Sequence, residues 1–462
     1  MSRFDPTAHP FLNGIFAPIH RELDETPVEV VAGALPPDLS GTYLRNGPNC
    51  RFPPIGSYTY PLDGDGMVHA VDIHDGRATY RNRFVRTPAM AAEERAGRAL
   101  WGGLLTPILP SAEEVGPELA GRYKDLPDVN VIRHAGRLLA LAESARPFLL
   151  RDDLETVGPW YWGGALPKGL TAHPKLDHAS GELVAFRYDF EAPLLTWSVI
   201  GADGSVVRAE QSVAIDATYM IHDCVITRRF LVLFVCPARF ELSGTPSLRW
   251  EPERGTRIAV IARDGSAATQ WIATEAFWVW HFANAFEEID ERGSTTIVVD
   301  FSRWSHLAMG EETAPATGAV TRARLDLAAG TARFDTLDER ITEFPRIDDR
   351  LTGQPHRYFY AASKDGTEGP GRWNALCRYD TVTGSVTKRA CGATMIGEPI
   401  FAPSTQGADQ DSGYVLTYAF EGERTSLLVL HASNIAGEPA AVLRLPQRVP
   451  FGLHGCWVPG AG

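Results

Sequence analysis

Asp380-Thr-Val-Thr-Gly384 lies between two strand-like runs, and its spacing of four between Asp and Gly recurs in Asp72-Ile-His-Asp-Gly76, Asp177-His-Ala-Ser-Gly181 and Asp326-Leu-Ala-Ala-Gly330. In each stretch the Asp side chain favours a turn and the Gly supplies a positive φ, so each predicts a hairpin. Successive Asp residues are 105, 149 and 54 positions apart, close to two, three and one units of about 50 residues, the length of a propeller blade. The spacing favours one β-propeller. The alternative is a set of unrelated hairpins, because Asp and Gly mark turns in any β protein.

The sequence around these turns is rich in strand-forming residues. Val, Ile, Leu, Phe and Tyr concentrate in five segments, 130–142, 225–236, 258–261, 296–301 and 413–420. Of the 462 residues 44% are hydrophobic and 22% are charged, which is typical of a packed globular chain. At about 50 residues per blade, this length accommodates seven blades. We therefore predict an all-β fold, a seven-bladed β-propeller that forms a single domain over residues 1–462.

Helical periodicity is confined to an insertion at residues 86–120. Its two helical segments are expected at 89–100 and 111–119. Between them, residues 99–110 (Ala-Leu-Trp-Gly-Gly-Leu-Leu-Thr-Pro-Ile-Leu-Pro) carry no charge and are too few to span a bilayer. This stretch could line a tunnel mouth or touch lipid as a peripheral membrane contact. The alternative is a lid packed on the propeller.

Charge and missing motifs exclude several classes of protein. The net charge of −13 repels polyphosphates, so we expect no nucleic-acid partner. The chain contains no G-x-S-x-G, H-E-x-x-H or P-loop motif, and its six cysteines form no C-x-x-C pair. It has no apolar run of 18 residues and no signal-peptide core at the N-terminus, so we expect a cytoplasmic protein. Nothing in the sequence indicates an obligate protein partner.

Four of the thirteen histidines stand in apolar or strand-end contexts: His173, His222, His281 and His454. They are separated by 49, 59 and 173 residues, that is, by one or more blade lengths. In a propeller, residues at such intervals meet near the axis, where the inner strands converge. The spacing predicts a ring of imidazoles able to bind a metal. The alternative for each histidine alone is an ordinary hydrogen-bonded core residue.

Longer motifs carry a resemblance to a known family. They are Leu35-Pro-Pro-Asp-Leu-Ser-Gly-Thr-Tyr-Leu-Arg-Asn-Gly-Pro48, Leu62-Asp-Gly-Asp-Gly-Met67 and Phe451-Gly-Leu-His-Gly455. In this order they resemble those of the carotenoid cleavage oxygenases, a group that includes apocarotenoid dioxygenases, lignostilbene dioxygenases and the retinoid isomerase. The resemblance runs nearly end to end. It implies a seven-bladed propeller with a helical dome over an axial iron site, to which the insertion at 86–120 contributes along with the substrate tunnel.

The resemblance also implies the site residues. One Fe(2+) per chain is held by His173, His222, His281 and His454, with O2 as co-substrate. Three glutamates in matching contexts orient the ligands: Glu143 with His222, Glu343 with His281, and Glu398 with His454. A carboxylate that accepts the outer N–H of an imidazole sets its tautomer and raises its basicity. No catalytic residue beyond the metal centre is expected.

The substrate is inferred from departures from the family pattern. Lignostilbene-type members hold a phenol with a Tyr and a Lys, where this chain has Leu104 and Ala142, and Val129 stands where members often have Thr. The predicted pocket comprises Trp101, Leu104, Val129, Ala142 and Phe451. We expect a small lipophilic alkene, an apocarotenoid or carotenoid, cleaved at a C=C bond into two carbonyl products. The alternatives are cleavage of a stilbene or phenylpropenoid such as lignostilbene, isoeugenol or a vinylphenol, and a metal-free propeller that serves as a binding scaffold.

Overall fold

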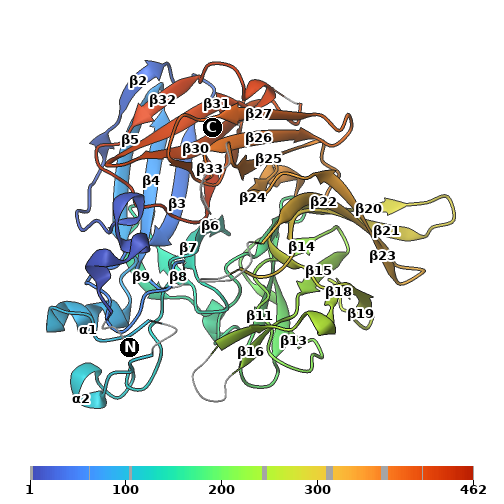
Figure 1. Cartoon of the computed structure of the whole chain (residues 1–462), viewed down its shortest axis with the longest axis horizontal. Helices are drawn as coiled ribbons and strands as arrows, with labels where there is room; N and C mark the ends of the chain where they lie inside the picture. The colour runs from blue at the N-terminus through green and yellow to red at the C-terminus, as the bar shows by residue number, and fades with distance from the viewer. Residues whose placement is uncertain are drawn as a thin grey trace.

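The computed structural model describes residues 4–460 except 62, 104–106, 242–246, 309–315, 366–372 and 408. Within these residues the backbone is mainly β, and seven sheets of four or more strands lie around a common axis, as Figure 1 shows. The predicted all-β, seven-bladed propeller is confirmed. We number the blades I to VII in chain order and give their strands from the axis outward.

Blades I to IV contain the strands of the first 274 residues except β2, together with the last strand of the chain. Blade I is β33 (Gly455–Pro459), β3 (Gly41–Pro48), β4 (Gly66–His74), β5 (Arg77–Phe84) and β1 (Thr26–Pro27). Blade II is β6 (Asn130–His134), β7 (Arg137–Leu141), β8 (Phe148–Leu150) and β9 (Thr156–Pro159). Blade III is β10 (Lys175–Asp177), β11 (Glu182–Tyr188), β12 (Leu195–Ile200) and β13 (Val206–Ser212). Blade IV is β14 (Val225–Ile226), β15 (Phe230–Val235), β18 (Thr256–Ala262) and β19 (Gln270–Thr274), with a separate hairpin of β16 (Ala238–Glu241) and β17 (Ser247–Trp250).

Blades V to VII complete the ring. Blade V is β20 (Trp278–Ile289), β21 (Thr295–Trp304), β22 (Gly318–Asp326) and β23 (Thr331–Asp338). Blade VI is β24 (Thr342–Arg346), β25 (Tyr358–Ser363), β26 (Ala375–Asp380) and β27 (Val386–Ala390). Blade VII is β28 (Met395–Ile396) and β29 (Ile400–Pro403), then β30 (Gly413–Glu421), β31 (Arg424–His431), β32 (Ala441–Arg444) and β2 (Glu29–Gly33). Short 3-10 turns join or precede these strands: η1 (Pro6–Ala8), η2 (Pro10–Leu12), η3 (Gly14–Phe16), η4 (Trp162–Gly164), η5 (Pro252–Arg254), η6 (Asp349–Leu351) and η7 (Ala432–Asn434).

Both ends of the chain close the ring. The C-terminal strand β33 pairs with β3 as the innermost strand of blade I, while the N-terminal strand β2 pairs with β32 at the outer edge of blade VII. The innermost strands contact one another around the axis, for example β33 with β6, β14 with β20, and β20 with β24. Residues at the start of these strands are therefore brought together although they are far apart in sequence.

The four Asp-Gly stretches all form hairpin turns, but only one interval between them equals a blade. The turns at Gly76, Gly330 and Gly384 join β4 to β5, β22 to β23 and β26 to β27, and each of these glycines has a φ near +70°. Gly181 instead joins the two inner strands of blade III. The 54-residue interval separates equivalent turns of the neighbouring blades V and VI. The 105- and 149-residue intervals both involve the turn after Asp177, which has a different place in its blade, so they do not measure whole numbers of blades. An Asp followed by a glycine of positive φ is favourable in any tight hairpin. The Asp-Gly spacing therefore predicts a turn but not the position of that turn within a blade.

Two predicted extended segments contain a turn. Residues 225–236 divide into the antiparallel strands β14 and β15. Residues 130–142 form the hairpin β6–β7, because Ala135 and Gly136 both have a positive φ, at +49° and +74°. A pair of such residues makes the tight turn that matches the twist of two antiparallel strands. The sequence near Ala135 lacks the usual Asn-Gly signal, which is why one long strand was expected.

The hydrophobic core lies between neighbouring sheets. Between blades IV and V, for example, Val232 and Val260 belong to the same buried cluster as Phe282 and Val299. Each of these side chains is at most 4% exposed. Burying a side chain of this size contributes about 1.5–3 kcal/mol, so each blade is held mainly by its two neighbours.

Two helices form in the 86–120 segment. Helix α1 (Pro88–Ala96) begins after Thr87, whose hydroxyl accepts from the Met90 N–H, and ends at Gly97, which has a φ of +65°. Helix α2 (Ala112–Val115) is a single turn. Figure 1 places both helices beside the N-terminal segment and away from β20–β23. Across the described part of the chain, neither helix has the length and apolar character that crossing a bilayer demands.

Candidate metal centre

The four histidines in apolar contexts meet on the propeller axis. His173 and His222 precede β10 and β14, His281 lies in β20, and His454 precedes β33, so they come from blades III, IV, V and I. One nitrogen from each ring lies within 4.8 Å of the others. All four side chains are buried, with exposed fractions of 3–9%. The structure brings together the complete set of residues that the sequence nominated as metal ligands.

The inward-facing nitrogens are the Nε2 atoms. His173 Nε2 and His222 Nε2 lie 3.2 Å apart, and His281 Nε2 and His454 Nε2 lie 3.1 Å apart. Imidazole nitrogens bind a metal such as zinc at about 2.0–2.1 Å, so two ligands at right angles on one ion stand about 3 Å apart. The observed separations match such an arrangement.

Three of the rings are paired with the glutamates named from the sequence. His222 Nδ1 lies 2.8 Å from Glu143 Oε2, His281 Nδ1 lies 2.5 Å from Glu343 Oε2, and His454 Nδ1 lies 3.0 Å from Glu398 Oε1. An ionised carboxylate only accepts hydrogen bonds, so each Nδ1 carries the proton. In the neutral ring, Nε2 then presents a lone pair toward the axis. Among the described residues, His173 has no such carboxylate partner.

The three carboxylates differ in their own partners. Glu398 accepts from two arginines, Arg45 at 2.9 Å and Arg346 at 3.0 Å. Glu343 accepts from the Trp304 indole N–H at 2.6 Å. The second oxygen of Glu143 is buried, and burial together with this glutamate holds the pKa of the neighbouring Tyr188 hydroxyl well above its usual value. The charge of Glu398 is thus balanced by guanidinium groups, whereas that of Glu343 is stabilised by a neutral donor.

Arg45, Arg346 and Trp304 were not identified from the sequence. Arg45 stands inside the Leu35–Pro48 motif, and Arg346 stands three residues after Glu343. An arginine inside a buried strand is a signal, because an arginine is rarely buried without a paired charge. Sequence alone does not name the carboxylate that it meets.

Burial and neighbouring charges separate the pKa values of the histidines. Burial, reinforced by the other three rings, holds the pKa of His173 well below its usual value. Burial also outweighs Glu398 and lowers the pKa of His454 to about 3. For His222, burial acts in the same direction, but Glu143 and Asp223 outweigh it and raise the pKa. His173 and His454 are therefore neutral at physiological pH, whereas His222 holds a proton more strongly than an ordinary histidine does.

The donor set fits a cation. Both His281 and His454 have their Nδ1 protons engaged, so in the neutral rings two lone pairs face each other across 3.1 Å. Buried lone pairs without a donor are unfavourable, and a metal ion between them removes the repulsion. Four imidazoles suit iron, zinc, copper or nickel. The described residues therefore form a group that could hold a metal ion, by chemistry as well as by position.

Two residues next to the glutamates have unusual backbone conformations. Ser144 follows Glu143 with a φ of +45°, and Phe344 follows Glu343 with a φ of +54°. A non-glycine residue in this region is strained and persists where its surroundings hold it. The Phe344 ring is 5.3 Å from His281 and 5.5 Å from His454, between centroids. This backbone conformation places the Phe344 ring beside the histidine cluster.

An apolar cluster lies beside the histidines. Val129, Ala172 and Leu453 are buried together and pack against Tyr60. The backbone N–H of His454 donates to the backbone carbonyl of Val129 at 3.1 Å. Phe451, also predicted for the pocket, packs on Tyr60 and is 4% exposed. Ala172 and Tyr60 were not named from the sequence.

The other predicted pocket residues are less close together. Ala142 is buried directly before Glu143. Trp101 belongs to a different cluster, with α1 and α2, and its indole N–H donates to the Arg122 carbonyl at 2.8 Å. Leu104 lies outside the described residues. The structure groups Val129 and Phe451 near the centre and places Trp101 in the helical segment.

Known proteins share this architecture over nearly the whole chain. The model of the family described as retinal pigment epithelial membrane protein matches residues 16–459. The chain is 32% identical to the carotenoid cleavage oxygenase of Mycobacterium tuberculosis, over 98% of both chains. It is 30% identical to the apocarotenoid-15,15'-oxygenase of Synechocystis, over 93% of this chain and 92% of that relative.

Solved structures agree with these sequence relatives. The lignostilbene dioxygenase of Pseudomonas brassicacearum superposes with a TM-score of 0.88 at 29% identity, covering 98% of this chain and 99% of the other. The apocarotenoid oxygenase of Synechocystis superposes with a TM-score of 0.84 at 28% identity, covering 96% and 97%. The chain is therefore similar to enzymes named for two different classes of alkene, apocarotenoids and lignostilbenes.

Proposed function

Because the chain belongs to the carotenoid cleavage oxygenase family, we propose that it is a non-haem Fe(II) oxygenase that cleaves a C=C bond of an apocarotenoid or carotenoid into two carbonyl products. The observation that carries this proposal is the convergence of four imidazole Nε2 atoms on the propeller axis, three of them backed by carboxylates. One Fe(2+) bound by His173, His222, His281 and His454 supplies the chemistry that activates O2.

The residues of the chain have three tasks in such a reaction. Glu143, Glu343 and Glu398 hold the Nδ1 protons and so aim Nε2 at the axis. The apolar cluster of Val129, Ala172 and Leu453 excludes water and offers a surface to an alkene. An alkene and O2 together contain all the atoms of two carbonyl products. No side chain is therefore required to donate or remove a proton.

The apolar lining supports a polyene substrate. Ala142 is a buried, uncharged residue where a phenol-binding lysine would be expected. A phenol hydroxyl buried without a partner costs about 1–3 kcal/mol, whereas a polyene gains from burial along its length. The residues at 104 and 142 therefore favour an apocarotenoid.

A second candidate is cleavage of a stilbene or phenylpropenoid. Its support is the likeness to a lignostilbene dioxygenase structure over nearly the whole chain. In that case another polar group would have to hold the phenol. A metal-free binding scaffold is the least favoured candidate, because the facing lone pairs of His281 and His454 would stay without a cation.

We also assign a role to the segment 86–120 in the dome and substrate tunnel. Its described apolar residues Ile108 and Leu109 are 41% and 42% exposed. Exposed apolar side chains of this size at a tunnel mouth would let the protein take a lipophilic substrate from a membrane surface. Residues 99–110 are the expected point of contact.

A substrate panel on metal-analysed protein tests the function. Purified enzyme is assayed for its iron content, then offered several apocarotenoids and several 4-hydroxystilbenes or vinylphenols, with carbonyl products identified by mass spectrometry. Cleavage of apocarotenoids supports the first candidate, and cleavage of phenolic alkenes alone supports the second. A protein that contains no iron and has neither activity would support the third candidate, a metal-free binding scaffold.

A further inference from the structure

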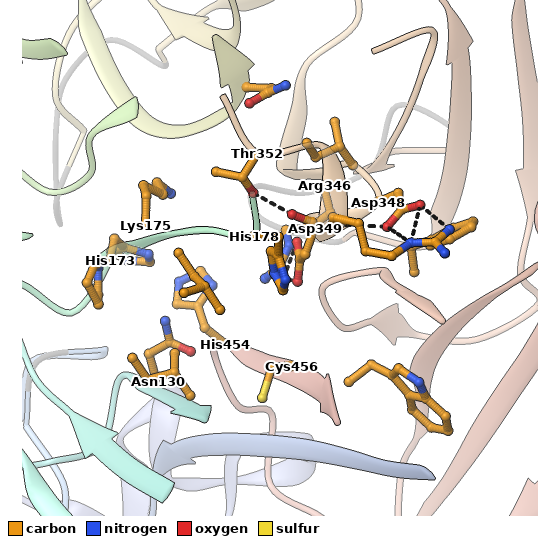
Figure 2. A pocket seen from close by; sticks show the side chains of 18 of the residues that line it. Asn130, His173, Lys175, His178, Arg346, Asp348, Asp349, Thr352, His454 and Cys456 are labelled. Atoms are coloured by element: carbon orange, nitrogen blue, oxygen red, sulfur yellow. Dashed lines mark hydrogen bonds and ion pairs between the residues drawn. The ribbon is translucent and has the colours of Figure 1, made fainter. Parts of the chain in front are cut away.

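A cavity of about 400 Å³ lies along the propeller axis and reaches the histidines. It is lined by His173, His281 and His454, and Figure 2 shows Lys175, Asp349, Thr352 and Cys456 around the same space. At about 30 Å³ for each water molecule, it has room for on the order of ten waters. The cavity is therefore large enough for an ion that keeps its hydration shell.

This axial cavity and the apolar cluster lie at opposite ends of the innermost strands. Val129, Ala172 and Leu453 come just before β6, β10 and β33. Lining residues of the cavity lie within the same strands, among them Ile132, Lys175, Leu176, Cys456 and Val458. Because the start and the end of a strand point to different ends of the axis, the histidines separate an apolar side from the axial cavity.

The walls of the axial cavity are charged and paired. Lys175 Nζ lies 2.7 Å from Asp223 Oδ1, Arg346 Nη2 lies 2.8 Å from Asp349 Oδ2, and Arg350 Nη2 lies 2.6 Å from Asp348 Oδ2. Four carboxylates and four cationic side chains line the space, the fourth of each being Glu398 and Arg133. Such walls hydrogen-bond water and offer carboxylate oxygens to a cation.

The wall of the axial cavity combines buried and exposed side chains. Glu398 and Asp348 are 2% and 5% exposed, whereas Asp349 and Arg350 are 41% and 49% exposed. His178, which Figure 2 also labels, is exposed. The cavity therefore leads from the protein surface to the metal ligands.

Alkene cleavage itself has no use for a polar passage. The alkene is apolar, and the reaction neither consumes nor releases water or a proton. The metal ion, by contrast, is hydrated in solution, and moving a charge through an apolar passage carries a large desolvation penalty. The four ligands also come from four blades of a closed ring, so the site cannot open by the movement of one loop.

We propose that the axial cavity is the path by which a hydrated divalent cation reaches and leaves the four histidines. This inference rests on the proposed metal site and adds the route to it. The ion moves between carboxylate oxygens of the charge pairs along the wall. The apolar cluster on the opposite side of the histidines excludes water and remains available to the alkene. Residues on this route, apart from the histidines and Glu398, control how fast metal exchanges, not how tightly it binds.

A plug at the surface end tests the route. Thr352 lines the axial cavity, and its hydroxyl donates to the Asp349 carbonyl at 2.8 Å. Full-length protein is stripped of metal with a chelator, and Co²⁺ uptake is followed by the absorption of the bound ion. Thr352→Trp should slow both uptake and chelator-driven release at least tenfold and leave the equilibrium Kd unchanged. Thr383→Trp, on an exposed turn of blade VI, is the matched control and should exchange like wild type.

A change of charge at the same end gives a second test without a bulky residue. Arg350→Gln removes an exposed positive charge from the cavity wall and leaves the buried Asp348 without its cation, which should raise Co²⁺ uptake several-fold at about 0.01 M salt and lose this effect at about 1 M salt. Arg340→Gln is the control, since Arg340 pairs with Asp338 at 2.7 Å with a similar exposure of 47% and does not line the cavity.

The outcomes separate the route from the site. Uptake rates equal to wild type in both Thr352→Trp and Arg350→Gln would overturn the route and leave the metal site standing. If wild-type protein binds neither Fe²⁺ nor Co²⁺, the proposed function fails instead.

Discussion

His281 and His454 point their Nε2 atoms at each other across 3.1 Å, while the Nδ1 atom of each ring faces its own glutamate. The two carboxylates force both lone pairs toward the axis. A cation between the two rings would relieve the repulsion of these lone pairs, and this relationship supports the proposal that the cluster is a metal site and not a set of core histidines.

Metal should stabilise the folded protein. A ligand that binds only the native state at 100 times its Kd adds about 2.7 kcal/mol to the free energy of unfolding. Calorimetry of the chelator-treated protein, with and without Fe²⁺ under anaerobic conditions, should show a rise in Tm on addition of Fe²⁺, and Mg²⁺ at the same concentration should not raise it. An equal Tm in all three samples would contradict the site.

Each of His222→Ala, His281→Ala and His454→Ala should lose iron and activity together, because the ligand atoms of all four histidines lie within 4.8 Å of one another. Iron is measured by atomic spectroscopy and cleavage by product formation. His431→Ala, an exposed histidine at the end of β31, should behave like wild type. Full activity in any of the three ligand variants would refute its assignment.

Loss of a paired carboxylate should weaken the site by about 10–100-fold in metal affinity or activity. Glu143→Gln, Glu343→Gln and Glu398→Gln are compared by titration with Co²⁺. Wild-type affinity in all three would show that the pairs do not tune the ligands.

Glu398→Gln should in addition destabilise the fold. It leaves the buried guanidinium of Arg45 without its anion, although Arg346 keeps its ion pair with Asp349, and breaking a buried ion pair costs about 3–5 kcal/mol. Glu143 has no arginine partner among the described residues, so Glu143→Gln should keep a near-wild-type free energy of unfolding. Urea denaturation of the two metal-free variants measures the difference. Equal free energies of unfolding would show that the ion pairing of Glu398 with arginine does not stabilise the fold.

Metal affinity should fall as the pH drops. Metal binding displaces the proton of His222, whose pKa is raised, while His173 and His454, whose pKa values are lowered, are already neutral near pH 6. Below the pKa of His222 the affinity should therefore fall at least about tenfold per pH unit. Co²⁺ titrations between pH 5 and 7.5 test this. Glu143→Gln removes the cause of the raised pKa and should flatten the profile, and a flat wild-type profile would contradict histidine ligation.

Substrate choice should follow the residues at 104 and 142. Wild-type enzyme should prefer an apocarotenoid over a 4-hydroxystilbene, and Leu104→Tyr with Ala142→Lys should shift the ratio of kcat/KM toward the phenol. The ratio is the measured quantity, because the double change also alters the absolute rate. Efficient wild-type cleavage of phenolic alkenes, with no activity on apocarotenoids, would favour the second candidate.

The sequence by itself determined the elements that depend on local chemistry. Asp72, Asp177, Asp326 and Asp380 each begin a hairpin turn, because an Asx side chain and a glycine of positive φ act over five residues. The helix expected at 89–100 forms at Pro88–Ala96, and it ends earlier than expected because Gly97 adopts a positive φ. The four histidines and three glutamates were accessible too, through motifs that resemble those of a family.

Only the tertiary structure decided what these residues meet. Arg45 and Glu398 are 353 positions apart, and their ion pair exists because the C-terminal strand β33 closes the ring against β3. The positive φ of Phe344 and the charged axial cavity likewise arise from packing between blades and have no local signature. Turns and caps are set by a few neighbouring residues, whereas a site on a propeller axis is assembled from every blade, and its electrostatics depend on contacts that no short stretch of sequence contains.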